Sequence, residues 1–216
     1  MDLLPKENAQ YGTQEYWDER YTKEDEGNTF EWFKSYADVK KLVNRFVPDK
    51  EAKIVMLGCG NSALSQDMYD DGYHNVHNID YSSVVIEKMA RANEAREGMT
   101  WTTADIRALP FPSGSIDVCI DKGTMDALLT GKGLDPWNPP EEVVKNVKGE
   151  VDEVVRVLKE SGRFLYLTFG QPHFRKPHLQ RPGWKVDVHE IGGESSFGYF
   201  WYVMEREAGE AGEGAP

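Results

Sequence analysis

Residues and patterns that would mark a secreted or membrane-spanning protein are scarce in this 216-residue chain. Only two cysteines occur, Cys59 and Cys119. Both fall in predicted strand or turn positions, where we favour reduced, packed thiols over a disulfide. No stretch approaches the ~18 apolar residues of a membrane span, and the first residues lack a signal-peptide pattern. We therefore expect a reducing compartment, the cytoplasm with the nucleus as the alternative, and no membrane partner.

Positive charge is also scarce: 25 lysines and arginines stand against 37 aspartates and glutamates, which gives a net charge of -12. Nucleic-acid binding depends on Lys and Arg contacts with phosphates, so this balance disfavours a nucleic-acid partner. An acidic protein attracts basic partners, although ordinary solubility explains the charge equally well. Part of the excess lies in segment 206–216, which we expect to be disordered. We expect residues 1–12 to be flexible and residues 13–205 to form one domain.

Signatures of metal and nucleophilic chemistry are missing as well. None of the five histidines has a Cys or carboxylate partner at metal-ligand spacing, so we predict no metal site. No arrangement of residues suggests a catalytic triad.

The most informative feature that is present is the run from Ile54 to Ser62, an apolar strand that ends in the turn Gly58-Cys59-Gly60. Glycines let a ligand approach the backbone closely. Asp80, after the next predicted strand, is placed to accept hydrogen bonds from both hydroxyls of a ribose. The pattern predicts a nucleoside site. Alone it does not separate NAD from other nucleosides, because NAD enzymes use the same geometry.

A third strand end sharpens this prediction. Asp105 follows another short strand, and the carboxyl ends of parallel strands line one crevice, so Gly58, Asp80 and Asp105 converge on one ligand. The NAD fingerprint requires a third glycine shortly after Gly60, where this sequence has Ser62 to Leu64 instead. A ribose carboxylate together with an adenine-edge carboxylate favours S-adenosylmethionine as the ligand.

Strand-like and helix-like segments alternate along the chain. The pattern predicts helices at 13–21, 32–46, 84–96 and 143–158, and a further helix that Asn61 or Ser62 caps and that runs toward Tyr69. Between the helices it predicts strands at 54–57, 76–79, 99–103, 116–121 and 163–169. This order predicts right-handed crossovers and a parallel sheet. Past Gly170, segments 184–191 and 197–204 alternate as strands do and should form an antiparallel hairpin at the sheet edge.

Four sequence blocks carry a family resemblance over most of residues 11 to 205: Glu15–Tyr21, Leu57–Ser65, Ile79–Val85 and Lys122–Leu129. In these blocks the chain resembles the seven-strand S-adenosylmethionine-dependent methyltransferases. Within them it is most similar to the lysine methyltransferases of translation elongation factor 1-alpha, type 4. The resemblance implies a Rossmann-like α/β sheet of order 3-2-1-4-5-7-6, with strand 7 antiparallel and helices on both faces, and we expect a monomer. One departure is Met56, where many members of the superfamily carry an acidic residue.

The resemblance also implies which residues bind the cofactor. Trp17, Tyr21 and Trp32 would form a lid over it, although such aromatics also simply pack helices onto a sheet. Tyr81 would flank the adenine ring, and Lys122 would contact the cofactor rather than lie on the surface. The full cofactor-binding set is Trp17, Tyr21, Trp32, Gly58, Gly60, Asp80, Tyr81, Asp105, Ile106 and Lys122.

Methyl transfer to a lysine demands alignment and exclusion of water more than acid–base chemistry. The amine must be neutral, and nearby carboxylates can orient it. Asp121 and Asp126, which leave the fourth strand, are the candidate catalytic residues, with helix capping as the alternative. Many amino methyltransferases carry an Asn/Asp-Pro-Pro-aromatic motif there. This chain has only Asn138-Pro139-Pro140, followed by Glu141, which we interpret as a loop leading into a helix.

The sequence therefore predicts a protein-lysine N-methyltransferase that uses S-adenosylmethionine and releases S-adenosylhomocysteine. The resemblance implies elongation factor 1-alpha as its basic protein substrate. Two alternatives stay open: a methyltransferase of a small molecule, and a cofactor-binding module without catalysis. A long acceptor channel open to a folded protein would distinguish the first of these from a protein methyltransferase.

Overall fold

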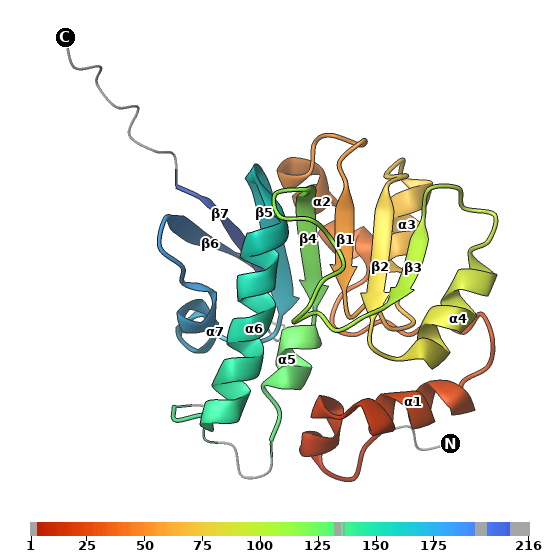
Figure 1. The fold of residues 1–216 in the computed structure, drawn as a ribbon, viewed down its shortest axis with the longest axis horizontal. Helices are drawn as coiled ribbons and strands as arrows, with labels where there is room; N and C mark the ends of the chain where they lie inside the picture. The colour runs from red at the N-terminus through yellow and green to blue at the C-terminus, as the bar shows by residue number, and fades with distance from the viewer. Residues whose placement is uncertain (1–3, 132–134, 136, 193–197, 208–216) are drawn as a thin grey trace.

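The computed structural model describes residues 4–131, 135, 137–192 and 198–207, and a seven-stranded sheet organises them (Figure 1). The strand order is β3-β2-β1-β4-β5-β7-β6; β7 is antiparallel to both neighbours and the other pairs are parallel. The strands are β1 Ile54–Leu57, β2 Val76–Asp80, β3 Thr100–Thr103, β4 Ile116–Lys122, β5 Leu158–Thr168, β6 Trp184–Ile191 and β7 Tyr199–Arg206. The fold class and strand order expected from the sequence are confirmed.

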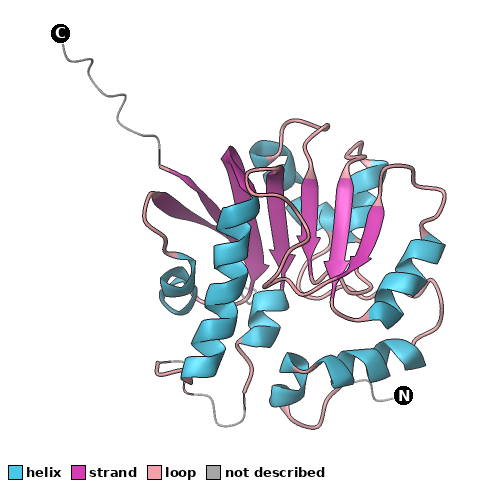
Figure 2. Cartoon of the chain, in the orientation of Figure 1, coloured by secondary structure: helices cyan, strands magenta, loops and turns pink. Residues whose placement is uncertain are grey.

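Helices cover both faces of the sheet (Figure 2), which is why β1 is apolar and buried at every position. In β1, Val55 and Leu57 pack into a core cluster with residues of α5, α6 and α7, whereas Ile54 and Met56 pack with α2 and α3 on the other face. The helices are η1 Asn8–Gly12, α1 Gln14–Lys23, α2 Tyr36–Phe46, α3 Leu64–Asp70, α4 Ser83–Ala92, α5 Thr124–Leu128, α6 Glu141–Val157 and α7 Pro172–Leu179.

The N-terminal segment lies across the carboxyl ends of the parallel strands. Figure 1 shows α1 there, in red, with its long axis roughly perpendicular to the strands. Tyr21 of α1 packs against Val85, Ile86 and Met89 of α4 in a third core cluster. Residues 8–12, which the sequence places in a flexible N-terminus, form the 3-10 helix η1. The N-terminal segment therefore forms a wall of the domain at the edge where a doubly wound sheet binds ligands.

Two helix boundaries differ from the sequence prediction by four residues each, and the other helix boundaries by one or two residues or not at all. The helix predicted to begin at Trp32 begins at Tyr36, because Ser35 caps it: the Asp38 carboxylate accepts the Ser35 backbone N–H at 2.9 Å. The helix predicted to run to Arg96 ends at Ala92. The short helices α5 and α7 and the early start of β5 at Leu158 were not predicted.

Some sequence predictions fall outside the described residues. The tail predicted to be disordered is described only to residue 207, and the hairpin connection only outside 193–197. Among the helices that the structure describes, none has the length and apolar character needed to cross a bilayer. Cys119 is buried, Cys59 partly so, and both are free thiols.

Candidate active site

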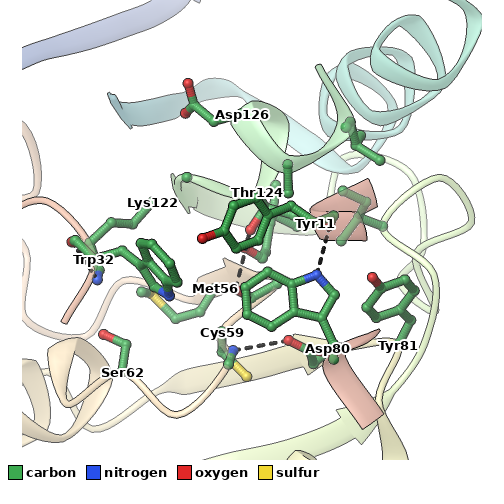
Figure 3. A pocket seen from close by; sticks show the side chains of 18 of the residues that line it. Tyr11, Trp32, Met56, Cys59, Ser62, Asp80, Tyr81, Lys122, Thr124 and Asp126 are labelled. Carbon is green, nitrogen blue, oxygen red and sulfur yellow. Dashed lines mark hydrogen bonds between the residues drawn. The ribbon is translucent and has the colours of Figure 1, made fainter. Parts of the chain in front are cut away.

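A cavity of about 330 Å³ lies at the carboxyl ends of the parallel strands, where the segments after β1, β2, β3 and β4 meet the N-terminal segment (Figure 3). All ten residues predicted to bind the cofactor line this cavity, and so does Asp126. Asp121, the other predicted catalytic residue, is not among the lining residues. The convergence predicted from three successive strand ends is therefore present.

The turn after β1 is shaped so that no side chain separates the backbone from a ligand. Gly58 and Gly60 both have left-handed backbone angles, with φ of 60° and 51°. A Cβ on Gly58 would lie 2.2 Å from Thr124 Oγ1, and a Cβ on Gly60 would lie 2.8 Å from the Tyr21 hydroxyl oxygen. Both positions therefore require glycine, for conformation and for space.

Asp80 ends β2 and holds this turn. One carboxylate oxygen accepts the Gly60 backbone N–H at 2.9 Å and the other accepts the Ser82 N–H at 2.9 Å. Figure 3 shows the carboxylate facing the turn from the cavity floor. Burial raises the pKa of Asp80 to about 6, although the backbone donors oppose this shift. A carboxylate has about four acceptor positions, so Asp80 retains capacity for two ribose hydroxyls.

Asp105, Ile106 and Tyr81 line the cavity beyond β2 and β3. Ile106 belongs to the buried core, and the Tyr81 carbonyl accepts a hydrogen bond from a side-chain amide of α1. Asp105 differs from Asp80 because its carboxylate is 41% exposed and forms an ion pair with Arg107 at 2.6 Å. The hydrogen bond from Arg107 lowers the pKa of Asp105. Arg107 also lines the cavity and was not singled out from the sequence.

Aromatic side chains of the N-terminal segment cover the cavity. Trp17 stacks on Tyr21 with ring centroids 5.6 Å apart, and its indole N–H donates to the Tyr11 carbonyl at 2.7 Å. Trp32 meets the Trp17 ring edge-on at 6.2 Å. These rings pack on one another and line the cavity at the same time.

Arg20 of α1 is a buried cation within this lid that sequence reasoning missed. It is 4% exposed, and its Nε donates to Glu24 at 2.9 Å. Its guanidinium lies 4.9 Å from the Phe30 ring centroid and 5.2 Å from that of Trp32. Cation–π contacts of this kind bind α1 to the segment that follows it. The only sequence signal was the spacing of four residues between Arg20 and Glu24.

Lys122, at the end of β4, meets the lid through Glu31. Its Nζ donates to Glu31 Oε2 at 2.7 Å and to the Trp32 carbonyl at 3.1 Å. The Glu31 carboxylate also accepts the Ser62 hydroxyl at 3.0 Å and the Ala63 backbone N–H. Burial lowers the pKa of Lys122, while the Glu31 charge opposes that shift. This ion pair connects the lid, the residues just after the glycine turn and β4.

Asp121 lies beneath the cavity wall and is fully buried. Its two oxygens accept the backbone N–H groups of Thr124 and Met125, each at 2.8 Å, at the N-terminus of α5. Glu150 of α6 is equally buried, and burial together with the Asp121 charge raises its pKa well above the usual range. This placement supports a positioning role for Asp121 through α5. It does not support the predicted direct contact with an acceptor.

Asp126 of α5 is among the residues that line the cavity, and three side chains hold its carboxylate. Thr168 donates at 2.7 Å, Arg175 at 2.8 Å and the Tyr166 hydroxyl at 2.8 Å. Asp126 is 8% exposed, and its ion pair with Arg175 is almost entirely enclosed. The predicted site residue is therefore fixed by partners that lie 40 or more residues away in sequence.

These features fit a cofactor that carries an adenosine group. The two glycines of the turn and the spare acceptor capacity of Asp80 suit a nucleoside, and the volume lies within the range of small-molecule sites. In the described part of the chain, no three His, Cys, Asp or Glu side chains gather in a way that could hold a metal ion. The fold and the site thus define a class, the α/β proteins that bind a nucleoside cofactor at the carboxyl edge of the sheet.

Comparison with known proteins narrows this class. The family model described as "Methyltransferase domain" matches residues 55–166. Mouse EEF1A lysine methyltransferase 4 is 39% identical over 204 residues, which cover 94% of this chain and 79% of that protein. The human eEF1A lysine and N-terminal methyltransferase is 36% identical over 88% of this chain and 27% of its own length. The chain therefore belongs to the S-adenosylmethionine-dependent methyltransferases, in the family of the EEF1A lysine methyltransferase 4 proteins.

Solved structures agree on the fold. A methyltransferase of Aquifex aeolicus that depends on S-adenosylmethionine superposes with a TM-score of 0.59 over 87% of this chain and 97% of that one, at 12% identity. At this identity the likeness concerns the fold alone. Together with the family assignment, it makes the protein a methyltransferase whose cofactor is S-adenosylmethionine.

Proposed function

We propose that this enzyme methylates the side-chain nitrogen of a lysine on translation elongation factor 1-alpha, in the cytoplasm. The similarity to EEF1A lysine methyltransferase 4 over nearly the whole chain supports the choice of substrate. The net charge of -12 suits a basic protein partner. The observation that carries the chemistry is the cavity itself, which is lined both by the glycine turn with Asp80 and by the buried residue Asp126.

Different residues around the cavity bind different parts of the cofactor. Asp80 accepts the two ribose hydroxyls, and Gly58 and Gly60 allow the chain of the cofactor to cross the backbone of the turn. Tyr81 and Ile106 enclose the adenine ring, and Asp105 accepts from its edge. Trp17, Tyr21 and Trp32 cover the cofactor, and Lys122, fixed by Glu31, contacts its amino-acid end.

When bound, S-adenosylmethionine supplies a methyl group that its sulfonium already activates. The protein aligns the acceptor with the methyl group and excludes water from the site. The aromatic lid excludes water, which favours the neutral form of an incoming lysine because burial penalises its charge. Asp126 sits beside the acceptor path as a fixed carboxylate that orients the amine hydrogens. No group on the protein is required to activate the methyl donor.

The test is transfer of labelled methyl from S-adenosylmethionine to purified elongation factor 1-alpha and to a whole-cell extract, with mass-spectrometric location of the site. One labelled lysine on the factor, absent with the Asp80→Ala enzyme, is the expected result. Labelling of another protein or of a small metabolite instead would reject the substrate and retain the enzyme class. Cofactor binding without any labelling would indicate a binding module.

A further inference from the structure

The strand order indicates from which side the acceptor must come. Along the carboxyl edge, β3 presents Asp105, β2 presents Asp80 and β1 presents the Gly58 turn, with β4 and Gly123 next. A cofactor whose adenosine lies at β3 and β2 and whose chain crosses the β1 turn has its reacting end near β4. The acceptor then approaches over β5 and β7, the next strands in the sheet.

Three aromatic rings stand on that side of the cavity, and we name them the aromatic trio: Phe33 before α2, Phe169 just after β5, and Tyr199 at the start of β7. The Phe33 ring centroid lies 5.4 Å from that of Phe169 and 5.9 Å from that of Tyr199. Phe33 and Phe169 line the cavity, and Phe169 is nevertheless 49% exposed. The trio therefore connects the enclosed cavity with the surface.

Phe33 is held there by an unusual backbone conformation. Its φ is 66°, and among the described residues it is the one non-glycine with a positive φ. The Lys34 backbone N–H donates to the Trp32 carbonyl at 2.9 Å, which closes a three-residue γ-turn around Phe33. The Phe33 ring packs over Gly123, where a Cβ would lie 2.8 Å from Phe33 Cε2. A bulky residue persists in such a turn only when its surroundings fix it, and strain of this kind concentrates at functional sites.

The structure already holds an ammonium group against the trio. Lys34 Nζ lies 4.8 Å from the Tyr199 ring centroid, a cation–π distance. The trio thus offers a ring face that accepts a lysine cation at the outer end of a path that leads to Asp126 and Gly123. The overall charge of -12 favours association with a basic protein surface.

We infer that the aromatic trio forms the channel for the acceptor lysine, and that Lys34 occupies its outer ring face until a substrate lysine displaces it. The ring faces pack the methylene chain of the incoming lysine and tolerate its cation before and after methylation. The inference rests on the proposed function, since it assigns the lysine path of the same site. It makes Phe33, Phe169 and Tyr199 determinants of acceptor binding, separate from the cofactor-binding residues.

The first test measures binding of elongation factor 1-alpha to enzyme loaded with S-adenosylhomocysteine, together with methylation kinetics. Phe169→Ala should weaken binding and raise KM about three-fold, since cation–π contacts at partly exposed rings are worth roughly this much, with an unchanged dissociation constant for S-adenosylhomocysteine. Phe169→Leu should behave like Phe169→Ala, and Phe169→Tyr like the parent. Tyr69→Ala, an aromatic on α3 outside the cavity, is the matched control and should change nothing. Parent-like binding by Phe169→Ala or Phe169→Leu would overturn the inference.

The second test predicts a fall in KM, whereas the first predicts a rise. Lys34→Met removes the resident ammonium, so KM for the protein substrate should fall about two-fold. Lys41→Met, the same change at an exposed lysine of α2, reports any general charge effect and should leave KM unchanged. A rise in KM for Lys34→Met, or an equal fall in both variants, would contradict the displacement.

A third measurement separates failure of the channel from failure of the proposed function. If the parent enzyme does not methylate elongation factor 1-alpha, the proposed substrate is wrong. The channel is then tested with Nα-acetyl-lysine amide added to enzyme loaded with S-adenosylhomocysteine, by NMR of labelled Phe and Tyr rings. Shifts of the Phe169 and Tyr199 ring signals, absent with the norleucine analogue, would support a lysine channel. Unshifted rings would refute it.

Discussion

The two ends of the cavity are built by different means. At the adenosine end, Gly58, Gly60 and Asp80 lie at or shortly after the ends of parallel strands. The backbone N–H groups of Gly60 and Ser82 donate to the Asp80 carboxylate and fix the turn. At the acceptor end, Asp126 and the aromatic trio are positioned by side chains from segments far apart in the chain. Nucleoside binding is thus encoded in short local motifs. The acceptor path depends on long-range packing, which can change without disturbing the cofactor site.

The strongest test of the adenosine end is Asp80→Ala. Two hydrogen bonds to a charged acceptor are lost, each worth ~1.5–3 kcal/mol, so affinity for S-adenosylhomocysteine should fall by at least a hundred-fold. Isothermal titration calorimetry measures this directly. Circular dichroism establishes that the variant is folded, because Asp80 also anchors the glycine turn.

Asp80→Asn is the matched control for that turn. It keeps one acceptor oxygen and the size of the side chain but removes the charge, so it should retain more affinity than Asp80→Ala. Unchanged cofactor affinity in both variants would sink the ribose assignment.

At the acceptor end the largest expected effect comes from Arg175→Met, which leaves the enclosed Asp126 carboxylate without its cation. Breaking a buried ion pair costs ~3 kcal/mol, so the free energy of unfolding should fall by about that amount. Methyl transfer should slow, and the dissociation constant for S-adenosylhomocysteine should stay the same. Urea denaturation and calorimetry measure the two quantities.

The double variant Asp126→Asn with Arg175→Met provides the control, since it removes both charges and should recover part of the stability. A parallel loss of cofactor affinity in Arg175→Met would show that the two ends are not separable.

The same division explains how far the sequence could be interpreted. Gly58, Gly60, Asp80 and Asp105 were found because each lies at or shortly after the end of a strand that the sequence predicts. The strand order came from the family resemblance. Neither periodicity nor spacing could reveal that Glu31 meets Lys122, 91 residues away. The turn at Phe33 could not be predicted either. The apolar pattern extended the helix back to Trp32, whereas in the structure Ser35 caps the helix, which begins at Tyr36, and Phe33 packs on Gly123.

A change of pH alone should change cofactor affinity, by less than the Asp80→Ala substitution does. The ribose hydroxyls need an ionised Asp80 as acceptor, and its pKa is about 6. At pH 5 roughly a tenth of the carboxylates are ionised, so cofactor affinity should be about ten-fold lower than at pH 7. The free energy of unfolding of the enzyme without cofactor should change in the opposite direction, so that it falls as the pH rises. Because the folded pKa exceeds the unfolded one, the contribution of Asp80 is complete below pH ~4 and is lost as pH rises through 6.

Calorimetric titrations at pH 5, 6 and 7 measure the affinity, and Asp80→Asn should abolish most of the dependence. If Asp80→Asn keeps the full pH profile, another group is responsible, for example Asp121, whose pKa burial also raises to about 6.

Asp105→Ala should have the smallest effect on cofactor affinity. Comparing it with Asp80→Ala distinguishes the two carboxylates at the same end of the cavity. Asp80 is buried and bonded to the backbone, whereas Asp105 is 41% exposed and shares its charge with Arg107. One hydrogen bond at a solvated edge contributes ~0.5–1 kcal/mol, so affinity for S-adenosylhomocysteine should fall about three-fold. Arg107→Ala should have an effect no larger, since it frees the carboxylate of Asp105 to accept from the ligand. A loss with Asp105→Ala as large as that with Asp80→Ala would mean that the bound cofactor draws Asp105 away from Arg107 into an enclosed contact. The adenosine end would then share the dependence on side-chain rearrangement that we assign to the acceptor end.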